Sequence, residues 1–158
     1  MNECKPVIEK DELITLIPHK GKMVLLSRIT AYNTTEHWLR SKYDVDSDCM
    51  FYDPRLGGIP SWLCFEFMAQ SISALSGITG RENGRTPKVG FILSVSNMEI
   101  KVPVFKKETT VGVEVREDCI VNEVFTFNCR VFLNDESAAT AKLTVMEVND
   151  FSLLENRR

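Results

Sequence analysis

A glutamate within an otherwise apolar stretch is the residue of this sequence best suited to chemistry. Glu66 lies in the segment IPSWLCFEFMAQSISALSGITG, where Glu66, Gln70, Ser73 and Gly77 are separated by four, three and four residues. In a helix these spacings place the residues on one face. A carboxylate is rarely buried without a partner or a function. Glu66 is therefore either an acid–base group or a structural carboxylate bonded to neighbouring backbone.

A histidine is the second candidate, because imidazole exchanges protons near neutral pH. The chain has two histidines, His19 and His37. His19 follows Pro18 and precedes the apolar run Met23–Leu26, and it is either a solvated or structural histidine or a site residue. His37 lies in Glu36–Tyr43, whose alternation predicts a half-buried strand, so we interpret His37 as structural.

The element that must position Glu66 is a long helix. Pro60 and Ser61 predict its start, because proline fixes φ and serine can cap free N–H groups. Gly80 predicts its end. Apolar residues between these points face every direction, so we expect the rest of the domain to enclose the helix. A helix of about 19 residues spans roughly 28 Å, but polar interruptions argue against a membrane span.

Segments rich in Val, Ile, Phe and Thr supply strands that can wrap this helix. We predict strands at Met23–Ala31, Glu36–Tyr43, Val89–Val104, Thr109–Arg116, Val121–Leu133 and Ser137–Val148. A short helix is expected at Glu9–Ile17, and Asn134-Asp135 predicts a tight hairpin turn. Two strands, a buried helix and four further strands predict an α+β fold in which an antiparallel sheet wraps one central helix.

The length suits a single domain over residues 1–158. Its core is expected at about residues 13–148, followed by a loose tail at Asn149–Arg158. A long antiparallel sheet has edges, and pairing across two subunits is one way to cover them.

Composition argues against several classes of partner and cofactor. The net charge of −3 is unsuited to a general nucleic-acid binder. The five cysteines are scattered and form no CxxC pair, which favours reduced thiols in the cytoplasm over a disulfide framework or a zinc site. The N-terminal residues lack the apolar core of a secretion signal, which also favours a cytoplasmic protein. No metal-ligand spacing or phosphate-loop motif is present, so no metal or nucleotide is expected.

Three motifs, in order, resemble the 3-hydroxyacyl-acyl-carrier-protein dehydratases of the hotdog fold. PHKGKMVLLSRI is similar to that family's PHR-P-LLVDRV, IPSWLCFEFMAQ to MPGVL-x-x-E-x-x-AQ, and GFILSVSNMEIKVPV to G-I-D-N-x-R-F-x-x-P-V. The agreement covers roughly Leu13–Val148. Trp62 and the triplet Met68-Ala69-Gln70 resemble most closely a divergent branch linked to bacterial aryl-polyene pathways. The resemblance implies a homodimer with active sites shared between its subunits.

The resemblance also implies an activity. A hydro-lyase of this kind converts a 3-hydroxyacyl thioester to a trans-2-enoyl thioester, with the substrate on the phosphopantetheine arm of an acyl carrier protein. On this hypothesis His19 is the base and Glu66 the acid, kept protonated because apolar surroundings raise its pKa. Gln70 would orient the carboxyl group. Backbone N–H groups near Ser61 and near Leu93–Ser94 would hold the carbonyl oxygen.

One position departs from the family pattern. The usual members carry a catalytic histidine in HFPG, fourteen residues before the helix carboxylate, and the same count back from Glu66 gives Tyr52. Tyrosine is a poor base at neutral pH, so Tyr52 is expected to line the site and donate a hydrogen bond at most. Two alternatives to the dehydratase stay open, and the missing histidine is the reason for the second. One is a hotdog thioesterase in which Glu66 activates water, and the other is a non-catalytic subunit that binds an acyl carrier protein.

Two surfaces are expected to meet partners. The strand near Val89–Ile100 is the predicted contact of an obligate homodimer with two-fold symmetry. Acyl carrier proteins are acidic, so lysines around the mouth of the site would steer them. The candidate lysines are Lys20, Lys22, Lys101, Lys106 and Lys107.

Overall fold

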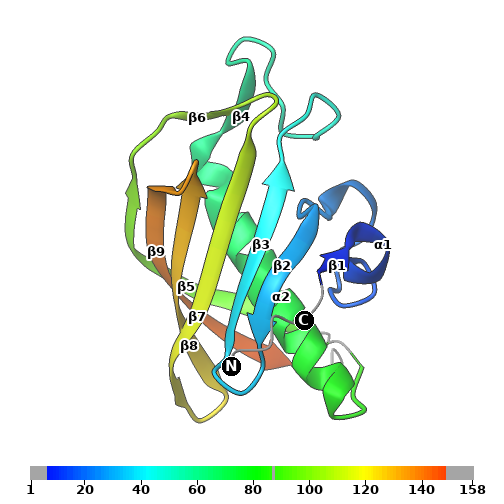
Figure 1. Cartoon of the computed structure of the whole chain (residues 1–158). Coiled ribbons are helices and arrows are strands. Elements are labelled where there is room, and N and C mark those ends of the chain that lie inside the picture. Colours follow the sequence, from blue (N-terminus) through cyan, green and yellow to red (C-terminus); the bar gives the residue numbers. More distant parts are fainter. Residues whose placement is uncertain (1–6, 87, 149–158) are drawn as a thin grey trace, which may run out of the picture.

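A long helix, α2 (Cys64–Glu82), lies against the concave face of a curved antiparallel sheet (Figure 1). The computed structural model describes residues 7–86 and 88–148. The sheet has seven strands in the order β1-β2-β3-β7-β8-β9-β5. Their bounds are Ile8–Glu9 (β1), Arg28–Asn33 (β2), Trp38–Asp44 (β3), Val89–Ile100 (β5), Thr110–Val121 (β7), Val124–Leu133 (β8) and Glu136–Val148 (β9). This architecture confirms the predicted α+β fold.

Shorter elements complete the fold around α2 and the sheet. Strands β4 (Gly58–Pro60) and β6 (Val104–Lys106) form a separate two-stranded ribbon, and a 3₁₀ turn, η2 (Ser61–Leu63), leads directly into α2. The helix α1 (Lys10–Leu13) and a second 3₁₀ turn, η1 (Gly21–Met23), belong to the N-terminal segment. The sequence pattern did not predict β1, β4 or β6, because strands of two or three residues are too short to show alternation.

The long strands follow the predicted alternation. In β3 every second residue, beginning at Leu39, is buried, which places one face of the strand on the core. Asn134 and Asp135 both have positive φ, 49° and 64°, as the predicted hairpin turn between β8 and β9 requires. Asn122, with φ 57°, lies in the turn between β7 and β8. We had placed this residue inside the predicted strand Val121–Leu133.

The core fills the space between the sheet and α2. Phe67 of α2 packs between two aromatic rings, with ring centroids 4.7 Å from Tyr43 and 6.3 Å from Phe105. From the N-terminal segment, Leu16 and Ile17 are almost fully buried in the same cluster. Burial of each large apolar side chain contributes about 1.5–3 kcal/mol, so these contacts fix the N-terminal segment against the helix.

Gly77 allows the N-terminal segment to approach α2 closely. A Cβ atom at this position would lie 2.0 Å from the carbonyl oxygen of Leu16, which is shorter than any real contact. The predicted stop at Gly80 is two residues early, since α2 continues to Glu82. Gly77 therefore serves packing rather than helix termination. Its missing side chain lets Leu16, two residues before Pro18, pack directly against α2.

We had predicted that a strand begins at Met23, but the segment Met23–Leu26 does not belong to a strand. The backbone N–H groups of Leu25 and Leu26 donate to the side-chain oxygen of Gln70, at 2.9 and 3.5 Å. The Lys10 ammonium group donates to the carbonyls of Val24 and Leu26, at 2.9 and 2.7 Å. Side chains thus satisfy the groups that a neighbouring strand would otherwise bind, and β2 begins only at Arg28.

The helix is not enclosed on every side. Most residues of α2 are buried, but Glu66, Ala69, Ser73, Ser76 and Thr79 form a half-buried stripe. The predicted helix at Glu9–Ile17 is also shorter, because only Lys10–Leu13 is helical and turns follow it. Among the described residues, no helix combines the length and apolar character that crossing a bilayer needs. The tail predicted to be loose, Asn149–Arg158, lies outside the described residues.

Candidate active site

His19 and Glu66, the two residues proposed for proton transfer, lie side by side in one chain. Nε2 of His19 is 3.3 Å from Oε1 of Glu66, and their side chains are 25% and 19% exposed. Glu66 comes from the first turn of α2, whereas His19 lies in the loop between α1 and η1. Both line a cavity of about 280 Å³, so a bound molecule could reach both groups.

Gln70 connects this pair to the loop that carries His19. Its side chain is fully buried, and its Nε2 donates to Glu66 Oε1 at 2.9 Å and to the Met23 carbonyl at 2.7 Å. Its Oε1 accepts from the N–H groups of Leu25 and Leu26. One amide therefore fixes the carboxylate and the Met23–Leu26 backbone together. The expected contact between Gln70 and the carboxyl group is present.

Glu66 does not have the raised pKa that its apolar surroundings led us to expect. Burial by itself raises the pKa of Glu66, but hydrogen bonds from His19 and Gln70, together with the charge of His19, outweigh this effect. The net pKa is lower than the ordinary value, so the carboxylate is ionised at neutral pH. The expectation was wrong because it counted burial and omitted the two donors on Oε1.

His19 has one nitrogen at the cavity and one in the protein interior. Its Nδ1 is buried and, among the residues that the structure describes, has no hydrogen-bond partner. An unsatisfied buried nitrogen costs about 1–3 kcal/mol, which the well-packed segment before it must offset. Nε2 is the nitrogen that faces Glu66, so this atom is the one placed to exchange a proton with the carboxylate.

The remainder of the cavity is mainly apolar near the pair and polar farther along α2. Pro18, Ala69, Phe91, Ile92, Ile72 and Val145 supply apolar surface, and Ser73, Ser76, Lys88 and Glu147 supply polar groups. An apolar cavity with a proton-transfer pair at one end suits a molecule with a reactive head and a hydrocarbon tail.

Comparison with known proteins identifies the family to which this arrangement belongs. The family described as "ApeP-like: ApeP dehydratase" matches residues 12–155. The chain belongs to this family. It is also 28% identical over 107 residues to the 3-hydroxyacyl-[acyl-carrier-protein] dehydratase FabZ of Chlamydia trachomatis serovar L2, covering 66% of this chain and 69% of that protein. With the FabZ of Haemophilus ducreyi it is 26% identical over 145 residues, covering 90% and 92%.

Solved structures place this ApeP-like chain in the hotdog fold. The dehydratase heterocomplex ApeI:P from Xenorhabdus doucetiae superposes with a TM-score of 0.81 at 21% identity, covering 90% of this chain and 95% of that one. The fold inferred from the sequence motifs is thereby confirmed. Membership in the ApeP-like dehydratases makes the chain a hydro-lyase by family and confirms the divergent branch that Trp62 and Met68-Ala69-Gln70 had indicated.

The backbone N–H of Ser61 is already engaged in this ApeP-like protein. Its N–H donates to the Pro103 carbonyl at 3.1 Å, so it is not free to hold a substrate oxygen. Its side chain makes no capping bond, and Pro60 occupies the cap position. The next two N–H groups, of Trp62 and Leu63, lie in the first turn of η2, where a helix offers no acceptor. The expected donor near Ser61 stays a prediction, but the N–H of Ser61 itself is not available for it.

The remaining predicted site residues lie away from the pair within one chain. Tyr52 is half-buried against the core and does not line the cavity of His19 and Glu66. Leu93 and Ser94 also lie outside the cavity lining, although Ile92 before them is part of it. The ladder between β5 and β9 shifts register between Ile92 and Ser94, so Leu93 is the extra residue of a β-bulge. Lys88 and Glu147 line the cavity but were not predicted from the sequence, because neither lies in a family motif.

Proposed function

We propose that the chain catalyses the dehydration of a 3-hydroxyacyl thioester carried by an acyl carrier protein to a trans-2-enoyl thioester. The observation that supports this most directly is the contact between His19 Nε2 and Glu66 Oε1 at 3.3 Å, at one end of an apolar cavity. The FabZ relatives are named for this substrate class. Dehydration needs one group that accepts a proton and one that gives a proton, and this pair contains both.

The lowered pKa of Glu66 sets the roles in the resting enzyme. Glu66 is ionised, so its carboxylate takes the proton from C2, the electron pair forms the C2=C3 bond, and the C3–O bond breaks. Protonated His19 gives its Nε2 proton to the departing hydroxyl, which leaves as water. Transfer of a proton from Glu66 to His19 then restores the starting state. These roles are the reverse of those in our sequence hypothesis, in which Glu66 was the acid.

Exchange of the substrate C2 proton with solvent tests these roles. If Glu66 is the base, a His19→Asn variant keeps exchange of the substrate C2 proton with deuterated solvent while losing dehydration. Under the same roles, Glu66→Gln loses both. The reverse result, with exchange kept in Glu66→Gln and lost in His19→Asn, would return the role of base to His19.

The thioester carbonyl needs donors as charge develops on its oxygen. The N–H groups of Trp62 and Leu63, at the start of η2 and just before α2, are suited to this because the helix dipole also favours negative charge there. We retain the bulged backbone at Leu93–Ser94 as a second source of donors. Tyr52 would line the site from the partner subunit, where it would donate a hydrogen bond at most.

The site is expected to be completed by a second hotdog chain. Strand β5 is one of the two edge strands of the sheet, and its exposed apolar residues include Leu93, which is 51% exposed. An apolar edge of 12 residues is a surface that native proteins cover. Our proposal is a homodimer in which two copies pair along β5. The related ApeI:P complex is named a heterocomplex, so a related chain in place of the second copy is the other outcome that light scattering and co-purification would reveal.

A paired assay on a 3-hydroxyacyl carrier protein tests the reaction itself. Formation of the conjugated enoyl thioester without free thiol supports the dehydratase. Release of thiol would support the thioesterase alternative, and binding without turnover would support a non-catalytic subunit. The phosphopantetheine arm enters only as part of the substrate, and no other cofactor is proposed.

A further inference from the structure

A second cavity, of about 230 Å³, lies farther along α2 than the first. Five residues line both cavities, so the two share a wall: Ile72, Ser76, Lys88, Val145 and Glu147. Glu66 and Ser76 are ten positions apart on one helix, which corresponds to about 15 Å of rise. An extended hydrocarbon of on the order of ten or more bonds covers this distance, so a long acyl chain starting at Glu66 reaches the shared wall.

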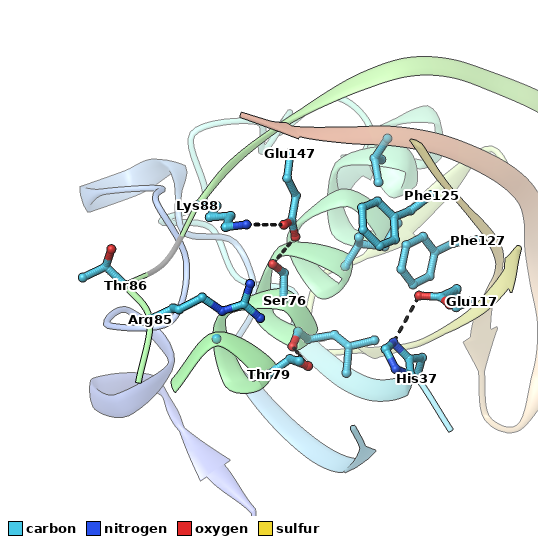
Figure 2. A pocket seen from close by; sticks show the side chains of 14 residues that line it. His37, Ser76, Thr79, Arg85, Thr86, Lys88, Glu117, Phe125, Phe127 and Glu147 are labelled. Carbon is cyan, nitrogen blue, oxygen red and sulfur yellow. Dashed lines mark hydrogen bonds and ion pairs between the residues drawn. The ribbon is translucent and has the colours of Figure 1, made fainter. Parts of the chain in front are cut away.

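The shared wall contains a polar cluster, which we call the partition: Ser76, Lys88 and Glu147. The Ser76 hydroxyl donates to Glu147 Oε1, and the Lys88 ammonium is 3.6 Å from Glu147 Oε2 (Figure 2). The Lys88 and Glu147 side chains are only 25% and 24% exposed. A plain alkyl chain that passes here separates or desolvates these groups without replacing their bonds, which is unfavourable.

The lining of the far cavity contains both apolar and polar side chains. Phe125 and Phe127 are two residues apart on β8 and therefore share a face, and Figure 2 shows both rings beside the cavity. His37 Nδ1 lies 3.1 Å from Glu117 Oε2 in the same lining. Arg85 also lines the cavity; its backbone N–H donates to the Gly80 carbonyl at 2.7 Å, whereas its guanidinium group has no hydrogen-bond or ion-pair partner within residues 7–86 and 88–148. A chain end that can form hydrogen bonds finds partners here that a methyl end cannot use.

We propose that Glu147 is a specificity-determining residue, which together with Ser76 and Lys88 admits to the far cavity acyl chains that carry a hydrogen-bonding group at their end and disfavours plain alkyl chains. This inference rests on the proposed function, because it takes the acyl chain to start at His19 and Glu66. It goes further by assigning the selection of the distant end of the substrate to residues of α2, β9 and the segment before β5. It also gives a function to the His37–Glu117 pair, which we had interpreted as structural.

Binding of saturated acyl pantetheines tests this proposal without any need for turnover. The probes are butyryl-, tetradecanoyl- and 14-hydroxytetradecanoyl-pantetheine, with Kd measured by calorimetry. The native protein is expected to bind the hydroxylated long chain about tenfold more tightly than the plain one, the scale of one net hydrogen bond. Glu147→Leu should remove or reverse this preference, which is the ratio of the two long-chain Kd values, and the butyryl Kd is the reference for a chain too short to reach the partition.

Two further variants keep the test decisive. Glu136→Leu makes the same change at the exposed start of β9 and should leave all three Kd values unchanged. Ser76→Ala leaves Glu147 without its hydroxyl donor, so this variant tests the partition if Glu147→Leu does not fold. In Ser76→Ala the preference for the hydroxylated long chain should fall severalfold. The proposal is overturned if the native protein shows no preference, or if a folded Glu147 or Ser76 variant keeps it in full. Normal selectivity without dehydration would instead refute the proposed function alone.

Discussion

Gln70 and His19 meet the same oxygen of Glu66. Nε2 of Gln70 donates to Oε1 at 2.9 Å, and Nε2 of His19 lies 3.3 Å from that atom. The second oxygen, Oε2, has no partner within the described part of the chain and remains for the substrate. Because both donors act on one oxygen, they hold the carboxylate in one orientation and lower its pKa together.

Gln70→Met should destabilise the protein and impair catalysis. Methionine has a similar length but cannot bond to Glu66, the Met23 carbonyl or the Leu25 N–H, which would leave buried polar groups unsatisfied. The expected loss is about 3 kcal/mol in the free energy of unfolding. Urea denaturation measures it, with kcat as a second readout. A Gln70→Met protein of native stability and activity would show that this amide does not organise the site.

Glu66→Gln should change how stability depends on pH. The pKa of Glu66 is lowered in the folded state, so its ionised form stabilises the fold above the unfolded-state pKa of about 4.3. This contribution is lost as pH falls through the lower folded-state pKa. The stability difference between native protein and variant should therefore be largest near pH 7 and shrink below about pH 4. A difference that grows at low pH would contradict the assigned direction.

Gly77→Ala should displace the segment that carries His19. The added methyl group would lie 2.0 Å from the Leu16 carbonyl oxygen, so we expect a loss of about 1–3 kcal/mol and reduced turnover. Gly80→Ala is the matched control on the same helix, since its Cβ would meet no atom closer than 3.6 Å. That control should be neutral or slightly stabilising because alanine favours helix. Equal effects of the two substitutions in thermal unfolding would rule out the proposed packing role.

Charge reversal at the predicted lysines should slow association with an acidic carrier protein. Lys20, Lys22, Lys101, Lys106 and Lys107 are all exposed, and Lys106 also donates to the Leu56 carbonyl at 2.9 Å. Omitting Lys106 avoids disturbing that contact, so the test uses Lys→Glu at the other four positions. Association should become slower and less dependent on salt in stopped-flow measurements. Unchanged kinetics would leave these lysines as ordinary solvated residues.

The sequence predicted the position and periodicity of the central helix better than the environment of its polar residues. Glu66, Gln70 and the long strands follow helix and strand periodicities, which depend only on local spacing. The pKa of Glu66 could not be predicted in this way, because its direction depends on a contact with His19 across 47 positions of the chain. The Met23–Leu26 segment has a strand-like composition, but in the folded chain its backbone binds the side chains of Gln70 and Lys10 instead of a neighbouring strand.

The partition was missed for a related reason. Ser76, Lys88 and Glu147 come from three separate segments and carry no spacing signal, so only the folded chain brings them together. Tyr52 illustrates the opposite case. Its distance in sequence from Glu66 matched that of the family's catalytic histidine. Within one chain, however, Tyr52 does not line the cavity of His19 and Glu66.

The most direct test of the account is the rate of enoyl thioester formation by the native protein and three variants. We predict that Glu66→Gln abolishes dehydration while the circular dichroism spectrum stays native. His19→Ala should reduce kcat/KM by on the order of a hundredfold or more, the usual scale for a proton-transfer group. Tyr52→Phe should have a far smaller effect. A His19→Ala enzyme with native activity beside an inactive Tyr52→Phe enzyme would contradict the account.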